Sequence, residues 1–118
     1  MKVKTGVYSG KYKNGKKHGQ GMMIWPDGRK YIGEFKDGEK YGYGVFTWPE
    51  GIRYEGEWKK GKPHGQGKLT LQNGAQHEGE YDSGEWHGYG VWTGVDGNRQ
   101  EGEWRYGKFV GESLELSR

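Results

Sequence analysis

The fold of this chain is decided by residues 54–67, which run Tyr54-Glu55-Gly56-Glu57-Trp58-Lys59-Lys60-Gly61-Lys62-Pro63-His64-Gly65-Gln66-Gly67. The first five residues alternate with period two, so the two rings and Gly56 face one side and the two glutamates face the other. Lys60-Gly61-Lys62-Pro63 then interrupts the alternation. The pattern predicts a β-strand followed by a loop.

A second alternating run extends from Gly65 to Leu71, with Gly67 and Leu69 on the side of Gly65. Asn73-Gly74 follows, and this dipeptide is typical of a hairpin turn with positive φ. Residues 54–76 therefore form a strand–loop–strand unit, and we expect successive units to add strands to one antiparallel sheet.

The unit recurs with a period of 23 residues and without insertion or deletion. Five glycine columns account for 23 of the 25 glycines. The columns are Gly10, Gly33, Gly56, Gly79, Gly102; Gly15, Gly38, Gly61, Gly84, Gly107; Gly19, Gly42, Gly65, Gly88, Gly111; Gly21, Gly44, Gly67, Gly90; and Gly28, Gly51, Gly74, Gly97. We divide the 118 residues, taken as one domain, into repeats 8–30, 31–53, 54–76 and 77–99 and a partial repeat 100–117.

Aromatic residues keep the same spacing and dominate a hydrophobic content of only 30%. Tyr8, Tyr31 and Tyr54 share one column, in which His77 and Gln100 follow, so we expect aromatic packing to thin toward the C-terminus. Glycine weakens a strand unless something needs its space. We therefore expect the rings to pack into gaps left by Gly56, Gly65 and Gly67, with neighbouring repeats burying them. Leu114 and Leu116 are expected to close the last edge of the sheet.

The stretch from Tyr54 to Gly67 resembles the MORN (membrane occupation and recognition nexus) repeat, and the similarity extends over residues 8–111. The resemblance implies an all-β, single-layer antiparallel sheet of hairpin repeats, curved into a groove. It also implies binding of protein segments, membrane association or assembly of larger complexes, and no chemistry of its own, although a fold predicts function poorly.

Residues that could carry catalysis or bind a metal have better structural explanations. His18, His64 and His87 form one column, but residues one repeat apart lie roughly 10 Å from each other, too far to share a zinc ion. The glutamate columns lie beside lysines on an open face without a desolvated pocket. Each Gly-x-Gly opens a strand and not a helix, which argues against a phosphate loop. We expect no enzyme, metal site or cofactor.

The exposed surface is therefore the candidate site. The leading hypothesis is a rigid scaffold that receives an extended or helical segment of a partner protein. The rings expected to line or support the surface are Tyr31, Phe35, Trp48, Tyr54 and Trp58. The glutamates expected to tune its charge are Glu34, Glu57 and Glu80. On the opposite face we expect some of Met22, Ile32, Tyr43, Val45, Tyr89 and Val91 to be accessible.

A second hypothesis is peripheral binding to anionic lipid. Residues 1–40 hold ten Lys/Arg against four Asp/Glu, whereas the rest holds nine against twelve. The basic residues are Lys2, Lys4, Lys11, Lys13, Lys16, Lys17, Arg29 and Lys30. A third hypothesis makes the chain an accessory module of a larger enzyme assembly, although the initiating Met and the degenerate last repeat favour a complete small protein. Nucleic acid is the weakest partner hypothesis, because the rings are needed for packing.

The remaining sequence features concern location and oligomeric state. The chain has no cysteine, no apolar run long enough to span a membrane and no signal-peptide core. These features predict a cytoplasmic protein, with a peripheral membrane location under the lipid hypothesis. The chain is expected to be a monomer or a homodimer paired through a sheet edge.

Overall fold

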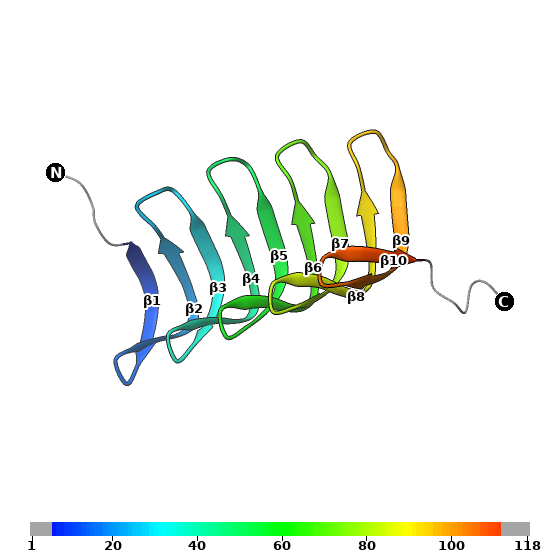
Figure 1. Cartoon of the computed structure of the whole chain (residues 1–118). Coiled ribbons are helices and arrows are strands. Elements are labelled where there is room, and N and C mark those ends of the chain that lie inside the picture. Colours follow the sequence, from blue (N-terminus) through cyan, green and yellow to red (C-terminus); the bar gives the residue numbers. More distant parts are fainter. Residues whose placement is uncertain (1–5, 112–118) are drawn as a thin grey trace.

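The computed structural model describes residues 6–111 and shows one antiparallel sheet of ten strands (Figure 1). The strands are β1 (Val7–Lys13), β2 (Lys16–Ile24), β3 (Lys30–Lys36), β4 (Glu39–Thr47), β5 (Arg53–Lys59), β6 (Lys62–Thr70), β7 (Gln76–Asp82), β8 (Glu85–Thr93), β9 (Arg99–Arg105) and β10 (Lys108–Gly111). Each strand is hydrogen-bonded to the next one in the chain. The all-β, single-layer fold predicted from the repeat is confirmed.

The turn within each repeat is shorter than predicted. Lys60 (φ 52°) and Gly61 (φ 79°) alone form the turn between β5 and β6, and positive φ at both positions is the geometry of a two-residue type I′ hairpin. Lys62 and Pro63 already belong to β6 and pair with Lys59 and Trp58. The prediction that these two residues interrupt the strands was wrong, because such a turn needs only the dipeptide.

The connection between repeats is a longer loop than Asn73-Gly74 predicted. Only Gly74 (φ 96°) has positive φ there. The Leu71 amide donates to the Ala75 carbonyl at 2.8 Å, and the Gly74 amide donates to the Leu71 carbonyl at 2.9 Å. Five residues therefore separate β6 from β7, and the asparagine side chain contributes a bond to the Ala75 amide at 3.0 Å.

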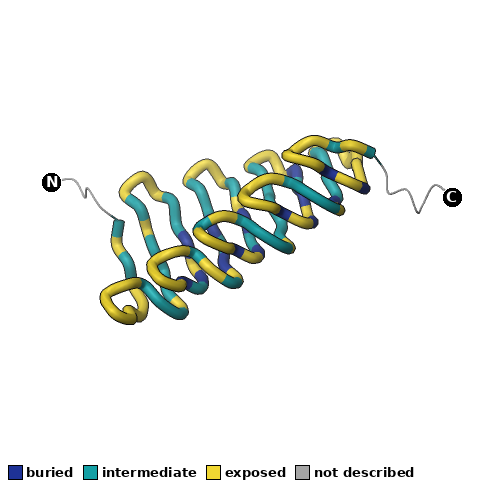
Figure 2. The backbone as a smooth tube through the Cα atoms, turned by 60° about the horizontal axis from the view of Figure 1, so that its bottom comes forward, coloured by how far each residue is buried: buried dark blue, intermediate teal, exposed yellow. Residues whose placement is uncertain are grey.

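A β-bulge bends the hairpin of each of the four full repeats, in the pairs β1–β2, β3–β4, β5–β6 and β7–β8. Gly33 pairs with Gly44, but Glu34 pairs with Tyr41, so β4 carries two extra residues at this point. One of them is Gly42, whose φ of 65° lies in the left-handed region that favours glycine. Bulges bend a strand and increase its twist. Because they recur in register, the sheet is folded lengthwise into a trough (Figures 1 and 2).

The tyrosines of the repeat lie flat over glycine pairs, as predicted. A Cβ atom on Gly44 would lie 2.2 Å from the Tyr31 hydroxyl oxygen, and one on Gly67 would lie 2.1 Å from that of Tyr54. Gly65 was wrongly assigned to this role. A Cβ there would meet the Glu57 carboxylate and not a ring, and the residue is required for its φ of 90° at the bulge.

The rings occupy the inside of the bend. The bulges divide the trough into two limbs, one on the side of the two-residue turns and one on the side of the loops between repeats. Trp58 and Phe46 belong to different limbs, yet their ring centroids are 6.0 Å apart, and the Tyr31 and Trp58 centroids are 5.3 Å apart. The Trp58 indole N–H donates to the Gly44 carbonyl at 3.1 Å. The buried row is dark in Figure 2 and comprises Tyr31, Phe35, Phe46, Tyr54, Trp58, His77, Tyr81 and Trp104. Contact between rings from both limbs thus holds the trough at its angle.

Aromatic packing does not thin at His77, contrary to the sequence-based expectation. The imidazole is fully buried and stacks on Trp86, with centroids 4.1 Å apart and planes 1° from parallel. Trp104 contacts it edge-on at 4.7 Å. Trp86 therefore replaces the ring surface that His77 lacks. Toward the C-terminus, the first exposed side chain of this column is that of Gln100. Leu114 and Leu116, expected to close the last edge, lie outside the described residues.

Candidate functional site

Two depressions that share Lys40 lie inside the trough, one lined by residues from Lys17 to Gly61 and the other by residues from Lys40 to Trp86, and together we call them the groove. One of its walls is built by a column of residues from the even-numbered strands: Lys17, Lys40, Pro63, Trp86 and Phe109. The backbone fixes this column, because the carbonyls of Lys17, Lys40, Pro63 and Trp86 accept N–H groups from the next repeat's turn glycine at 2.9–3.2 Å. The 23-residue spacing could have revealed the column, but its mixed composition hid it from the sequence analysis.

Lys40 lies inside an aromatic cage. Its ammonium is 5.5 Å from the ring centroids of Trp25, Phe46 and Trp58 and 5.9 Å from that of Tyr31. Such cation–π contacts stabilise an ammonium that is partly removed from water. Burial lowers the pKa of Lys40, nearby Arg29 lowers it further, and Glu39 partly opposes them. Among residues 6–111 no carboxylate oxygen lies within 4.0 Å of this ammonium.

Pro63 leaves a gap in the same wall. Its short ring stands between the long side chain of Lys40 and the indole of Trp86, and a cleft of about 330 Å³ opens there. The lining is mostly aromatic and aliphatic: Phe46, Trp48, Tyr54, Trp58, Leu69 and Tyr81, besides the three wall residues. Ligand clefts in proteins usually measure about 300–1,000 Å³ and are predominantly apolar. This cleft is the candidate functional site.

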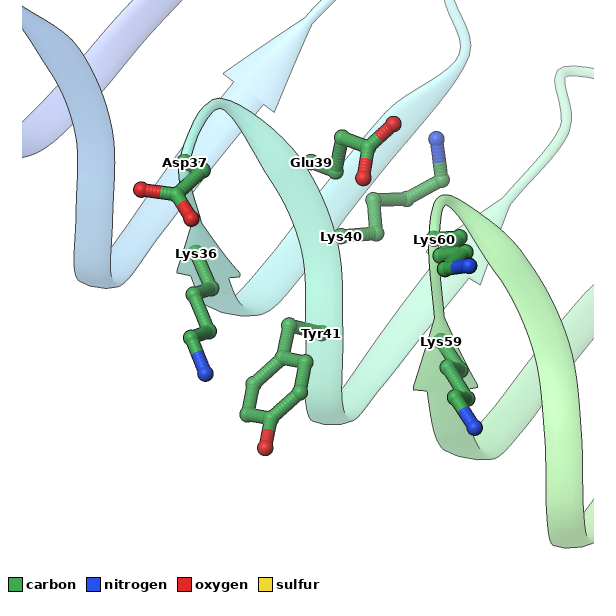
Figure 3. Close-up of a pocket in the computed structure, with 7 residues that line it drawn as sticks. All are labelled: Lys36, Asp37, Glu39, Lys40, Tyr41, Lys59 and Lys60. Carbon is green, nitrogen blue, oxygen red and sulfur yellow. The ribbon is translucent and has the colours of Figure 1, made fainter.

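The edge of the sheet next to the cleft is rich in lysine. A depression of about 220 Å³ lies between the turns of the second and third repeats and is lined by Lys36, Asp37, Glu39, Lys40, Tyr41, Lys59 and Lys60 (Figure 3). Lys40 and Tyr41 project to opposite sides of β4 in this view. A second depression of about 380 Å³ is lined by Lys59, Lys60, Lys62, His64 and Ser83. We call the exposed side chains of Lys59, Lys60 and Lys62 the lysine rim.

The predicted partner-binding residues lie on two different faces. Tyr31, Phe35, Tyr54 and Trp58 are at most 5% exposed and form the floor of the groove, so they support the surface and do not present it. Trp48 is half-buried and lines the cleft directly. The structure thus brings the five rings together.

The three glutamates are on the outside of the bend, away from the rings. Glu34 accepts the Tyr43 amide at 3.3 Å. Carboxylate oxygens of Glu57 and Glu80 lie 2.3 Å and 2.2 Å from where a Cβ on Gly65 and on Gly88 would be. These side chains cover the bulges, and the structure does not place them at the groove.

The predicted lipid-binding residues are also divided. Lys11, Lys13, Lys16 and Lys17 surround the first turn, whereas Arg29 and Lys30 lie at the opposite edge of the sheet, where β3 begins. Arg29 pairs with Asp27 at 2.8 Å and lies 5.3 Å from the Trp25 ring centroid. Lys2 and Lys4 lie outside the described residues.

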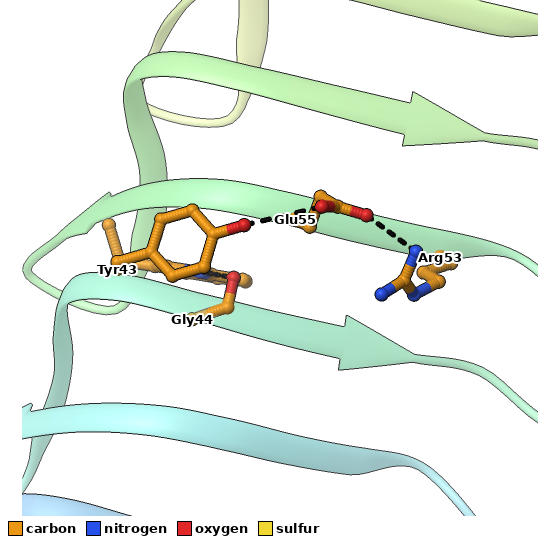
Figure 4. A network of polar contacts seen from close by, with 5 residues as sticks. Tyr43, Gly44, Arg53 and Glu55 are labelled. Atoms are coloured by element: carbon orange, nitrogen blue, oxygen red, sulfur yellow. Dashed lines mark hydrogen bonds and ion pairs between the residues drawn. The ribbon is translucent and has the colours of Figure 1, made fainter.

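The outer face carries accessible apolar groups, as predicted. Ile32, Tyr43 and Tyr89 are 47%, 53% and 40% exposed, and Met22, Val45 and Val91 are half-buried. Tyr43 donates to Glu55 at 3.2 Å, and Glu55 pairs with Arg53 at 2.5 Å (Figure 4). Tyr89, Glu101 and Arg99 repeat this network two repeats later. Tyr43 and Tyr89 are thus each held against a paired carboxylate.

Metal-binding and membrane-spanning features were sought in the same part of the chain. Within residues 6–111 no three His, Cys, Asp or Glu side chains are grouped so that they could hold a metal ion. His64 lies 3.5 Å from Asp82, and His87 packs on Tyr106. No helix that could cross a membrane occurs among these residues.

Comparison with known proteins identifies the repeat. The family model for the MORN repeat matches residues 8–28, 31–53, 54–76, 77–99 and 101–112. No curated protein sequence matches the chain significantly. Repeats of this family generally serve in protein and membrane interaction and are generally non-enzymatic. With five matches that cover most of its length, the chain belongs to the MORN repeat family.

Proposed function

We propose that the chain is a non-catalytic scaffold that receives a segment of a partner protein, extended or helical, in the groove. The apolar cleft between Lys40 and Trp86 carries this proposal. Half-buried Trp25 and Trp48, which both pack on Phe46, continue the apolar surface. Interfaces are enriched in such aromatic side chains, and binding energy concentrates where they line a pocket.

The rigidity of the groove supports the same proposal. Its floor is a continuous row of edge-to-face ring contacts, such as Tyr54 with Trp58 at 5.1 Å and Tyr54 with Tyr81 at 5.0 Å. A groove that keeps its shape without a partner loses little conformational entropy on binding. It therefore suits a scaffold, including one that serves as an accessory module within a larger enzyme assembly.

Site-specific photo-cross-linking tests the proposal. A benzophenone amino acid replaces Trp48, which lines the cleft, or Tyr43, which lies on the outer face of the same repeat. Circular dichroism confirms that both variants fold. We expect a discrete adduct with a cellular protein from position 48 only. Adducts from position 43 alone would move the interaction to the outer face and refute the groove.

A second candidate function is peripheral binding to anionic lipid, and exposed Lys11, Lys13 and Lys16 favour it. Each lysine near an anionic membrane contributes about 1 kcal/mol, and the attraction decays within a Debye length. Lipid binding through this turn would therefore depend steeply on salt. It would also be lost in a K11Q/K13Q/K16Q variant, whereas the groove would keep its partner.

A further inference from the structure

The cleft lies where one repeat departs from its neighbours. At the same wall position Lys40 reaches over four rings, Trp86 stacks on His77, and Phe109 packs on Trp104 at 5.1 Å. In the third repeat this position holds Pro63, whose ring is smaller than these side chains and lines the cleft. The vacant volume therefore has the position and lining of a missing bulky side chain, and a partner can supply that side chain from outside.

The chemistry of the lining selects an apolar anchor. Trp48 presents ring surface, Leu69 adds an aliphatic side, and buried Trp58 and Tyr81 form the floor. Both ring hydroxyls at the cleft already donate to carbonyls: that of Tyr54 to Glu57 at 3.0 Å and that of Tyr81 to His77 at 3.0 Å. The Trp58 N–H is likewise engaged. With few donors left free, the cleft suits an aromatic or leucine side chain and not a polar one.

The charges beside the cleft select the residues that flank this anchor. Lys40 forms one end of the cleft without a carboxylate oxygen within 4.0 Å, and Lys60 and Lys62 of the lysine rim flank Gly61, which lines the cleft. The acidic groups of this edge belong to the adjoining turns: Asp37 and Glu39 line a depression with Lys36 and Lys40, and Asp82 lies near His64. The third repeat thus offers positive charge alone at its turn, which complements a negatively charged segment.

We infer that the cleft at Pro63 takes one aromatic or leucine side chain of an acidic peptide segment, whose carboxylates pair with Lys40 and the lysine rim. This inference rests on the proposed scaffold function and deepens it. It states what the partner must carry: a bulky apolar anchor with acidic residues on either side.

Fluorescence polarisation with three labelled nine-residue peptides tests the inference. The first consists of Asp and Glu around a central Phe, the second replaces that Phe with Ala, and the third replaces the acids with Lys and Arg. The protein is compared with P63W, which fills the cleft with the residue that Trp86 provides one repeat later, and with P63A, which leaves the cleft open. A third variant, K59Q/K60Q/K62Q, removes the charge of the lysine rim.

The inference predicts a specific pattern. The acidic Phe peptide binds at least about tenfold more tightly than the other two. P63W weakens this binding about tenfold or more, P63A changes it less than about threefold, and K59Q/K60Q/K62Q weakens it and flattens its salt dependence. Circular dichroism and thermal melts confirm that each variant folds.

Other outcomes overturn the inference and can be told apart from failure of the scaffold itself. Equal or tighter binding of the basic peptide, still lost in P63W, would refute the acidic partner but keep the groove. Peptide binding that P63W leaves unchanged, or no binding of any peptide at millimolar concentration, would refute the cleft as the site. Cross-linking from position 48 would then test the scaffold function independently. If no peptide bound, and if the protein and P63W sedimented equally with phosphatidylserine vesicles, the lysines would be assigned to a membrane surface.

Discussion

Buried His77 makes the stability of the trough depend on pH. Its ring is fully enclosed, and neither ring nitrogen has a hydrogen-bond partner within residues 6–111. Burial lowers the pKa of His77 from 6.5 to about 4. The folded protein therefore excludes a proton that the unfolded chain binds, so the contribution to stability is present above pH 6.5 and is lost as pH falls toward 4.

The magnitude follows from the shift. Each pKa unit corresponds to about 1.36 kcal/mol, so the shift of His77 removes about 3 kcal/mol of unfolding free energy between pH 6.5 and pH 4. H77Y introduces the tyrosine that the earlier repeats carry at the equivalent positions 31 and 54, and it removes the titrating imidazole. The difference in unfolding free energy between H77Y and the unchanged protein should therefore grow by about 3 kcal/mol as pH falls across this range.

Urea unfolding followed by tryptophan fluorescence, at pH 7.5, 6, 5 and 4, measures this difference. Taking differences between proteins cancels the titration of carboxylates that both share. H18Q, which removes a half-buried histidine, is measured beside it as the control variant. A constant difference between H77Y and the unchanged protein from pH 7.5 to 4 would refute the assignment of His77 as a buried neutral group.

Two further substitutions test the packing of the trough. G44A places a Cβ 2.2 Å from the Tyr31 hydroxyl oxygen and should lower the unfolding free energy by about 3 kcal/mol. G94A, whose Cβ comes no closer to a neighbour than 3.1 Å, from the Asp96 carboxylate, should cost under about 1 kcal/mol in the same urea titration. Equal losses for the two would contradict the ring-over-glycine packing. W58F removes the indole N–H bond to the Gly44 carbonyl and should cost about 1–3 kcal/mol, measured by thermal and urea unfolding, and an unchanged stability would show that this bond does not hold the two limbs together.

Much of the fold could be predicted because its determinants repeat. Period-two alternation defines the strands, and the pairing of Gly33 with Gly44 and of Gly56 with Gly67 follows from equal spacing in every repeat. The tyrosines over these glycines follow from size alone. The resemblance implied a curved sheet, but the position of the bend was not predicted. A bulge depends on the relative register of two strands, and one sequence pattern does not show which glycine takes positive φ at an irregular position.

The site was harder to predict than the fold because it depends on differences between repeats. Sequence analysis expected rings such as Tyr31 and Tyr54 to line or support the binding surface, and regular repetition buries them in its floor. The accessible groove is formed by the irregular column of Lys40, Pro63 and Trp86. Glu57 alternates with the rings along β5, and in a sheet this alternation puts it on the other face.

Vesicle co-sedimentation tests most directly the central claim that the chain recognises a protein segment and not a membrane. The protein is sedimented with vesicles of phosphatidylcholine and with vesicles containing phosphatidylserine, at low salt and at about 150 mM salt, where charges are screened over about 8 Å. Our account predicts that any binding to the anionic vesicles is lost at the higher salt. Binding that persists there, and that disappears in K11Q/K13Q/K16Q, would contradict the account and assign the function to the membrane surface.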